Sequence, residues 1–240
     1  GAESISSNAS MKKQLFELGG NDALVVFNGS DYKKAVDTII SQRFGCAGQR
    51  CTASKRIYLQ NECYEEVKQL LLAKTRQLVV GDPLNRDVFL GPVVSEDSAK
   101  IIEERILNAG KNGARVLCGG KREGAIIHPT VIEDVTTKME LISEETFGPV
   151  APLFKFDNID DLISKINNSS FGLQCGVFSN DVNIAKKLFS DIDVGTVVIN
   201  EGPGYRADHF PFGGNKASGI GREGARYALM EFSQLKTLVF

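Results

Sequence analysis

Residues 150–200 read VAPLFKFDNIDDLISKINNSSFGLQCGVFSNDVNIAKKLFSDIDVGTVVIN. Three short apolar runs in this stretch have the length and composition of buried strands: Val150–Phe156, Gln174–Phe178 and Thr196–Asn200. Between them, amphipathic stretches that begin near Ile159 and Val182 have the spacing of helices. Because strands alternate with helices, the stretch predicts an α/β domain with a largely parallel sheet.

The same alternation continues outward to both ends of the chain. Further strands are predicted at Ala23–Phe27, Lys55–Gln60, Ala114–Cys118 and Lys236–Phe240. Further helices are predicted after Asp31 as N-cap, over Glu62–Leu78, after Ser95 and near Gly224–Leu235. No internal repeat or linker divides the chain. The sequence therefore predicts one α/β domain whose mostly parallel open sheet is flanked by helices.

The composition is that of an ordinary soluble globular protein, with 42% hydrophobic and 24% charged residues in a chain of 240. The formal net charge is −2, which argues against nucleic acid and acidic membrane surfaces as partners, since little positive charge is available to neutralise phosphates. No apolar run approaches the ~20 residues needed to cross a bilayer. The five cysteines are odd in number and form no C-x-x-C pair. We therefore expect no disulfide framework, no structural metal site and a cytoplasmic location.

One cysteine stands out by its surroundings. Gly45–Ala53 lies between a predicted helix and a predicted strand, and its small residues allow a sharp turn and the close approach of a substrate. Cys51 in this segment could be an exposed thiol that is activated by the neighbouring charge of Arg50. The alternative is a buried structural cysteine, which is the commoner fate of a free thiol.

A thiol nucleophile usually needs a base, and histidine is the frequent choice. His128 precedes a proline and His209 lies in the long loop after residue 200, without a recognisable protease context. Glu17, followed by Leu-Gly-Gly, offers a carboxylate instead, although a glutamate in this setting is normally solvated. Gly219-Ile-Gly-Arg-Glu-Gly224 matches a dinucleotide fingerprint, but it follows a loop and does not open a βαβ unit, so we interpret it as coincidental.

Taken together and in order, eight segments resemble the aldehyde dehydrogenase superfamily. They are Glu17-Leu-Gly-Gly, Gly48-Gln-Arg-Cys51, Gly81-Asp-Pro, Pro129-Thr-Val, Glu145-Thr-Phe-Gly-Pro-Val, Phe171-Gly-Leu, Gly195-Thr-Val-Val-Ile-Asn200 and Pro211-Phe-Gly-Gly-Asn-Lys-Ala-Ser-Gly219. They extend from residue 17 to beyond residue 210, which is nearly the whole chain. No single segment is decisive, but the ordered set is very hard to obtain by chance.

The resemblance implies a role for each matching residue. Cys51 would be the nucleophile and Glu17 the base that activates water to release the acid product. The residues that would contact the cofactor, NAD or NADP, are Glu145 at the nicotinamide ribose, Phe147 beside it and Leu18 near the nicotinamide ring. The residues that would shape the substrate pocket are Arg50, Thr52, Arg206 and Phe212. The implied reaction oxidises an aldehyde to its carboxylic acid through a thioester on Cys51.

The resemblance also implies a division of the chain. Residues 1–16 would be the tail of a cofactor-binding domain, or alternatively a tag, residues 17–235 the catalytic domain, and residues 236–240 a strand that pairs with a neighbouring subunit. The rest of the cofactor-binding domain, with an asparagine of the oxyanion hole, would lie upstream of this sequence. We therefore expect a homo-oligomer, an assembly with a complementary cofactor-binding domain, or both.

The substrate class follows from the segment before Pro211. Gly204-Tyr-Arg206-Ala-Asp resembles the branch that acts on lactaldehyde, glyceraldehyde or phosphonoacetaldehyde. Arg206 together with Arg50 would suit such a small hydroxylated or anionic aldehyde, whereas the alternative makes Arg206 a structural salt-bridge partner. Two other functions stay open: a stand-alone thiol esterase that uses Cys51 and Glu17, and an inactive fragment that only forms oligomers.

Overall fold

The computed structural model describes residues 1–240 and contains a central seven-stranded sheet. The strand order is β11-β10-β2-β3-β8-β7-β4, and every neighbouring pair is parallel except β4 and β7. The strands are β2 (Ala23–Val26), β3 (Arg56–Gln60), β4 (Arg115–Cys118), β7 (Thr130–Glu133), β8 (Val150–Phe156), β10 (Gln174–Phe178) and β11 (Thr196–Ile199). The predicted α/β fold with a mostly parallel sheet is thus confirmed, and β7 is the strand of this sheet that the pattern did not predict.

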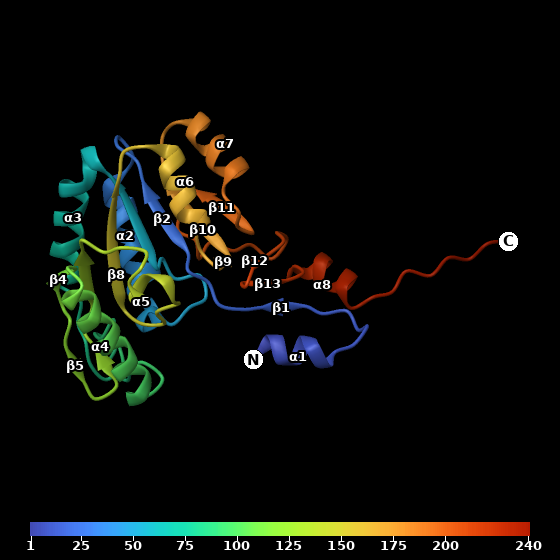
Figure 1. Cartoon of the computed structure of the whole chain (residues 1–240), viewed down its shortest axis with the longest axis horizontal. Coiled ribbons are helices and arrows are strands. Elements are labelled where there is room, and N and C mark those ends of the chain that lie inside the picture. Colours follow the sequence, from blue (N-terminus) through green and yellow to red (C-terminus); the bar gives the residue numbers. More distant parts are fainter.

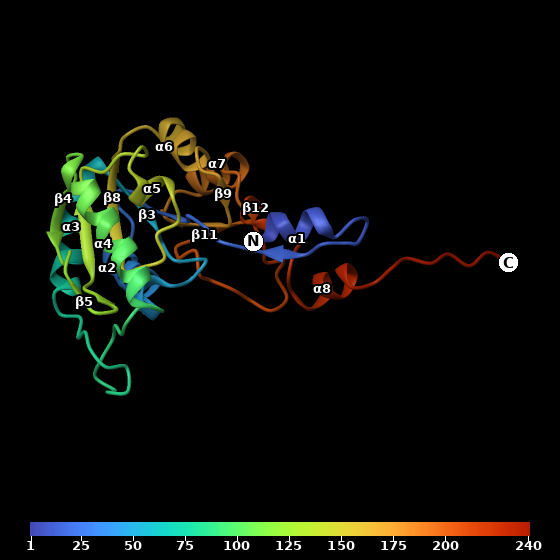
Figure 2. The same cartoon turned by 60° about the horizontal axis from the view of Figure 1, so that its bottom comes forward.

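Helices cover both faces of the sheet. They are α2 (Tyr32–Ile39), α3 (Asn61–Thr75), α4 (Glu96–Lys111), α5 (Glu140–Ser143), α6 (Ile159–Asn167) and α7 (Val182–Asp191). The chain runs from β2 through β3 to β8 and then returns to β10 and β11, so right-handed crossovers place α2 and α3 on one face and α6 and α7 on the other. Figures 1 and 2 show α6 and α7 together on one side of the sheet.

The predicted helix starts rest on side chains that cap the first turn. Asp31 accepts a hydrogen bond from the N–H of Lys34, and Ser95 accepts one from the N–H of Ser98. The apolar residues of the helix predicted after Asp31, from Ala35 to Phe44, are buried as their spacing predicts. After Ile39, however, the α-helix gives way to a π-helical turn over Ile40–Phe44, which leads directly into the cysteine segment.

A smaller extension carries both chain ends to one side of the sheet (Figures 1 and 2). Its strand pairs are β1 (Phe16–Glu17) with β13 (Gly219–Ile220) and β9 (Phe171–Gly172) with β12 (Asn215–Lys216), and its helices are α1 (Ala2–Asn8) and α8 (Ala225–Glu231). A separate hairpin of β5 (Arg122–Glu123) and β6 (Ile126–Ile127) lies beside α4. The glycine motif begins in β13, which pairs antiparallel with β1, so it is not part of the parallel βαβ unit that a dinucleotide fingerprint requires.

The C-terminal predictions need correction. The last helix ends at Glu231 rather than near Leu235, and Lys236–Phe240 forms no strand. All five of these residues are exposed, and no other strand of the chain lies beside them to complete a hydrogen-bond ladder. None of the helices has the length and apolar character that a membrane span requires.

Candidate active site

Three loops that precede parallel strands meet at one edge of the sheet. The loop after Glu17 leads into β2, the loop of Cys51 leads into β3, and the loop of Glu145 leads into β8. These three strands are neighbours and parallel, so their amino ends lie side by side. Open α/β sheets more commonly bind ligands at the carboxyl ends of their strands, so this edge is an unusual place for a site.

Glu17 and Cys51 meet at this edge. The Cys51 thiol lies beside the Glu17 carboxylate, and each group influences the pKa of the other. Glu17 is held in β1, where it pairs with Gly219 of β13. Its Oε1 atom is buried and accepts no hydrogen bond. The structure therefore brings the predicted nucleophile and the predicted base together, although 34 positions separate them in sequence.

The Cys51 thiol is half-buried, and its surroundings favour the protonated form. Burial raises its pKa most, and the charge of Glu17 and the hydrogen bond to it add to the rise. Lys55 and the N–H group of Thr52 act in the opposite direction, and the pKa is about 11. The expectation that Arg50 activates an exposed thiol is wrong, because the Arg50 guanidinium donates a hydrogen bond to the Ser41 carbonyl at 2.7 Å.

The loop of Cys51 is tightly folded. Cys46 and Ala47 both have the left-handed φ of 54°, and Gly48 follows with a φ of +72°. A Cβ atom on Gly48 would lie 2.4 Å from the carbonyl oxygen of Gly148 in the loop before β8. The small residues of this segment therefore permit a close approach between two loops of the chain.

Glu145 is tied to the loop of Cys51 by a buried lysine. Its Oε1 atom accepts hydrogen bonds from the N–H of Gly20 at 3.1 Å and from the ammonium group of Lys55 at 2.9 Å. The same ammonium group donates to the carbonyl oxygens of Arg50 at 2.9 Å and Cys51 at 2.6 Å. The second carboxylate oxygen, Oε2, accepts no hydrogen bond within the chain and stands where a Cβ on Gly19 would clash with it.

Phe147 follows in the same loop, and its ring is 43% exposed. The Lys55 ammonium lies 5.7 Å from the centre of this ring. Two arginines hold the main chain of the loop: Arg43 donates to the carbonyl oxygens of Thr146, Gly148 and Val150, and Arg105 donates to that of Glu145 at 2.8 Å. The main chain of the loop is therefore held by the two arginines, while the Phe147 side chain is partly exposed.

Arg206 and Phe212 lie together on the long loop before β13. The Arg206 guanidinium sits 4.3 Å above the Phe212 ring and bonds the Glu223 carboxylate at 2.7 Å. The charges of Glu223 and Arg206 raise and lower the pKa of Glu17, respectively, after the larger rise caused by burial. Arg206 and Phe212 also line a cavity of about 230 Å³ against β11. Arg206 is thus both a salt-bridge partner of Glu223 and a neighbour of the Glu17 carboxylate.

Three further residues predicted to contact substrate or cofactor, Thr52, Leu18 and Arg50, lie around the loop of Cys51 and β1. Thr52 is buried behind Cys51, and its contribution is the N–H group that reaches the sulfur. The N–H of Leu18 donates to the Ser218 carbonyl at 3.0 Å, and its side chain lines a cavity of about 450 Å³ beside α1 and β13. Arg50 remains beside the loop, where its Nε atom is buried without a partner.

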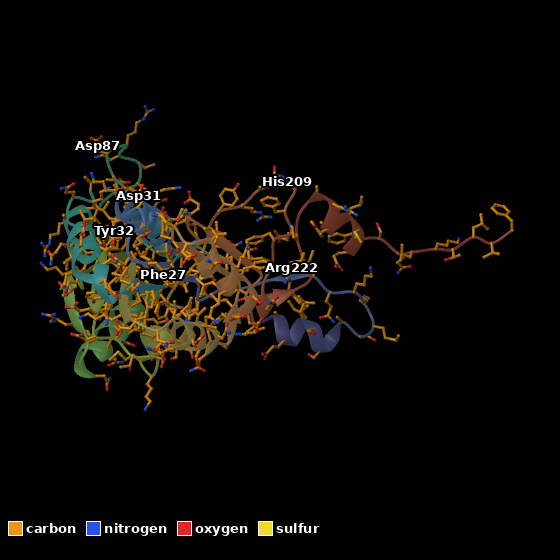
Figure 3. All side chains as sticks on the ribbon, turned by 90° about the horizontal axis from the view of Figure 1, so that it is seen from above. Phe27, Asp31, Tyr32, Asp87, His209 and Arg222 are labelled. Atoms are coloured by element: carbon orange, nitrogen blue, oxygen red, sulfur yellow. The ribbon has the colours of Figure 1, made fainter.

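Neither histidine is placed to serve Cys51. Figure 3 shows His209 at the outer edge of the long loop, where its ring packs at a tilt against Phe210, with 4.3 Å between the ring centres. His128 lies 3.2 Å from the Glu123 carboxylate in the separate hairpin. A Cys–His hydrolase therefore finds no support in this arrangement.

The sequence matches the model of the Aldehyde dehydrogenase family over residues 2–238. The chain belongs to the aldehyde dehydrogenase family. It is 48% identical over 238 residues to a sulfoacetaldehyde dehydrogenase of Neptuniibacter caesariensis, covering 99% of this chain and 52% of that protein. It is 40% identical to a lactaldehyde dehydrogenase of Methanococcus maripaludis, covering 99% and 51%. The chain spans about half the length of the curated relatives that it matches.

Solved aldehyde dehydrogenase structures share the fold. A glyceraldehyde-3-phosphate dehydrogenase from Methanocaldococcus jannaschii, complexed with NADP, superposes with a TM-score of 0.95 at 36% identity over 98% of this chain and 51% of that one. A lactaldehyde dehydrogenase from Escherichia coli gives 0.92 at 30% identity over 97% and 50%. The family expectation from the ordered segments is thus confirmed, and an NADP complex among these relatives agrees with the expected cofactor.

Three cationic residues of the aldehyde dehydrogenase site escaped the sequence analysis. Lys55, Arg43 and Arg105 are polar residues next to apolar runs, a pattern that normally indicates a solvated side chain. Lys55 and Arg43 are instead 3% and 1% exposed. Nothing in their spacing marks them, because Arg43 and Arg105 donate to carbonyl groups of a loop distant in sequence, and Lys55 joins its own loop to the distant Glu145 carboxylate.

Proposed function

We propose that this chain is the catalytic half of an NAD- or NADP-dependent aldehyde dehydrogenase that converts a small anionic or hydroxylated aldehyde to its acid. In this proposal Cys51 is the nucleophile and Glu17 is the base. One observation carries the proposal: the Cys51 thiol contacts the Glu17 carboxylate at the edge where Glu145 and Phe147 also lie. Residues 17–235 form the catalytic unit, and residues 1–16 belong to a cofactor-binding domain.

The electrostatics of the pair suit a base-assisted nucleophile. A thiol with a pKa of about 11 is protonated at neutral pH, so its proton must pass to an acceptor as the sulfur attacks the aldehyde carbon. Burial raises the pKa of Glu17, which makes this carboxylate a better proton acceptor than an ordinary one. The unpaired Oε1 atom of Glu17 is available for that proton, which Glu17 releases to solvent before it takes one from water. The N–H of Thr52 stabilises negative charge on the sulfur.

Loss of a hydride then leaves a thioester on Cys51, and the nicotinamide, when bound, supplies the acceptor for that hydride. Water attacks the thioester carbonyl carbon while Glu17 takes a proton from the water. The carbon–sulfur bond breaks, the carboxylic acid leaves, and Cys51 recovers its proton. A carboxylate base at this position favours hydrolysis over transfer of the acyl group to another thiol.

The residues at this edge fit a nicotinamide ribose. Glu145 presents an oxygen, Oε2, that is free to accept from a hydroxyl group, because the other oxygen already binds Lys55 and Gly20. The exposed ring of Phe147 offers a flat apolar surface beside it. Gly19 and Gly20 leave room, since a side chain on Gly19 would strike the Glu145 carboxylate.

The substrate assignment rests on Arg206 and on the relatives. Arg206 acts on the Glu17 carboxylate and lines the adjoining cavity, so its guanidinium is positioned to bind an acidic or hydroxyl group of a bound aldehyde. Relatives are named for sulfoacetaldehyde, 3-sulfolactaldehyde and lactaldehyde. All three compounds are short aldehydes with a sulfonate or a hydroxyl group near the carbonyl carbon.

Nicotinamide reduction with sulfoacetaldehyde, lactaldehyde and propanal tests the proposal, first with this chain alone and then with the chain extended by a family cofactor-binding half. We expect reduction by the extended protein that is lost in Cys51→Ala and kept in Cys46→Ala, which removes an exposed cysteine of the same loop. Cleavage of p-nitrophenyl acetate by the chain, without reduction of either cofactor in any form of the protein, would favour the thiol esterase instead. Undiminished reduction by the extended protein in Cys51→Ala would contradict Cys51 as nucleophile.

A further inference from the structure

The Lys55 ammonium group uses all of its hydrogen-bond donors between the loop of Cys51 and the loop of Glu145. An ammonium group has three N–H donors. In this chain its partners are the Arg50 carbonyl at 2.9 Å, the Cys51 carbonyl at 2.6 Å and the Glu145 carboxylate at 2.9 Å. The side chain is 2% exposed, so solvent screens these contacts very little. One buried cation therefore binds the main chain of the nucleophile and the carboxylate proposed to bind ribose.

The charges around Lys55 come from several elements. Asp22, before β2, and Glu145, before β8, attract its ammonium group, whereas Arg43 of the π-helical turn repels it. Cys51 and Glu17 complete the set, since Lys55 stabilises the thiolate form of Cys51 and Glu17 opposes that form. A buried cation shared in this way is a poor source of net stability, because desolvation offsets much of the attraction. Its position is better explained by what it does to the two groups it joins.

We propose that Lys55 is a positioning residue for the proposed oxidation: its ammonium group holds the Cys51 main chain against the Glu145 carboxylate and makes the reactivity of the sulfur depend on the charge of Glu145. The inference rests on the proposed function. Negative charge at Glu145 neutralises part of the ammonium charge, and the thiolate of Cys51 then gains less from Lys55. Removal of that negative charge leaves the full cation to stabilise the thiolate.

The test measures alkylation of Cys51 by iodoacetamide across pH in this chain, with mass spectrometry of the Cys51 peptide. Lys55→Met keeps the length of the side chain without its charge, and we expect alkylation about tenfold slower at a fixed pH below the thiol pKa. Glu145→Gln should have the opposite effect and accelerate alkylation several-fold. Lys34→Met, which removes a surface charge paired with Glu201, should leave the rate unchanged.

The double variant separates a charge effect from damage to the fold. If Glu145 acts through Lys55, Glu145→Gln should have little effect in the Lys55→Met background. Lys55→Arg keeps the charge and should recover part of the wild-type rate, with thermal unfolding of each variant as the check on folding. An unchanged rate in Lys55→Met, or the same acceleration by Glu145→Gln in both backgrounds, would overturn the inference. If the extended protein with Cys51→Ala still reduced the nicotinamide with aldehyde at the wild-type rate, the proposed function would fail instead.

Discussion

The main chain of Gly48 lies against the carbonyl group of Gly148, so that a methyl group on Gly48 would come within 2.4 Å of the carbonyl oxygen. Gly48 is three residues before Cys51, and Gly148 is three residues after Glu145. This contact joins the loop of the proposed nucleophile to the loop that carries the proposed ribose-binding residues. Both partners are main-chain atoms, so neither can move aside as a flexible side chain could.

Gly48→Ala should therefore destabilise the protein. The added methyl group meets a carbonyl, and alanine at a φ of +72° carries a strain of about 1–2 kcal/mol. We expect urea unfolding to show a loss of about 2–3 kcal/mol, with slower alkylation of Cys51. Gly110→Ala is the matched control, since Gly110 lies in α4 with open space around it and should gain up to about 1 kcal/mol. Equal effects of the two substitutions would contradict the contact.

Glu17→Gln should separate the two stages of the proposed reaction. The charge of Glu17 raises the pKa of Cys51, so its removal should make the thiol more acidic and its alkylation several-fold faster at about pH 8. Hydrolysis of an acyl group on Cys51 should slow by about 10²-fold or more, because the base is gone. Mass spectrometry after exposure to p-nitrophenyl acetate would detect the accumulated acyl-enzyme. Rapid loss of the acyl group in Glu17→Gln would remove Glu17 from the mechanism.

Asp22 should make stability depend on pH. Burial raises its pKa to about 7, while the unfolded chain has a value near 3.9. The folded form thus binds the proton more tightly, and this contribution to stability is full below about pH 4 and lost as pH rises through about 7. Asp22→Asn cannot exchange that proton. The wild-type free energy of unfolding, relative to that of Asp22→Asn, should therefore fall between about pH 4 and about pH 7. A pH-independent difference in urea unfolding would refute the assignment.

Arg206→Gln should weaken the binding of charged aldehydes selectively. Loss of a charge-assisted hydrogen bond costs about 1.5–3 kcal/mol, so kcat/KM for sulfoacetaldehyde should fall about 10- to 100-fold in the extended protein. The value for propanal, which has no charged group, should change much less. Arg226→Gln removes the same charge at an exposed position of α8 and serves as the control. A uniform loss for both aldehydes would make Arg206 a structural partner of Glu223 only.

The fold was largely predictable from local patterns. Val150–Phe156 and Gln174–Phe178 have the strand bounds expected from their apolar runs, and Asp31 and Ser95 cap helices as their positions predict. Within this chain Lys236–Phe240 has no strand beside it, so the predicted pairing of this segment with a neighbouring subunit stays a prediction.

The site was predictable only in part. The meeting of Glu17 and Cys51 was expected from the resemblance, and the structure places the two groups in contact. The Arg50 guanidinium bonds the Ser41 carbonyl, so its suggested activation of the Cys51 thiol finds no support, whereas its contact with substrate stays a prediction. Lys55 could not be found from the pattern, because its burial depends on how three loops converge.

The proposed site lies at the amino ends of β2, β3 and β8, so the pairing register of these strands sets the positions of its residues. Lys55 immediately precedes β3, and Glu17 and Glu145 each lie only a few residues before a strand. A one-residue slip of any of these strands would therefore move a residue of the proposed site by about 3.3 Å. At the carboxyl ends of these strands lies no residue of the proposed site. The exposed turn at Asn28 and Gly29, beyond the far end of β2, is therefore a suitable place to insert a fluorophore or an affinity tag.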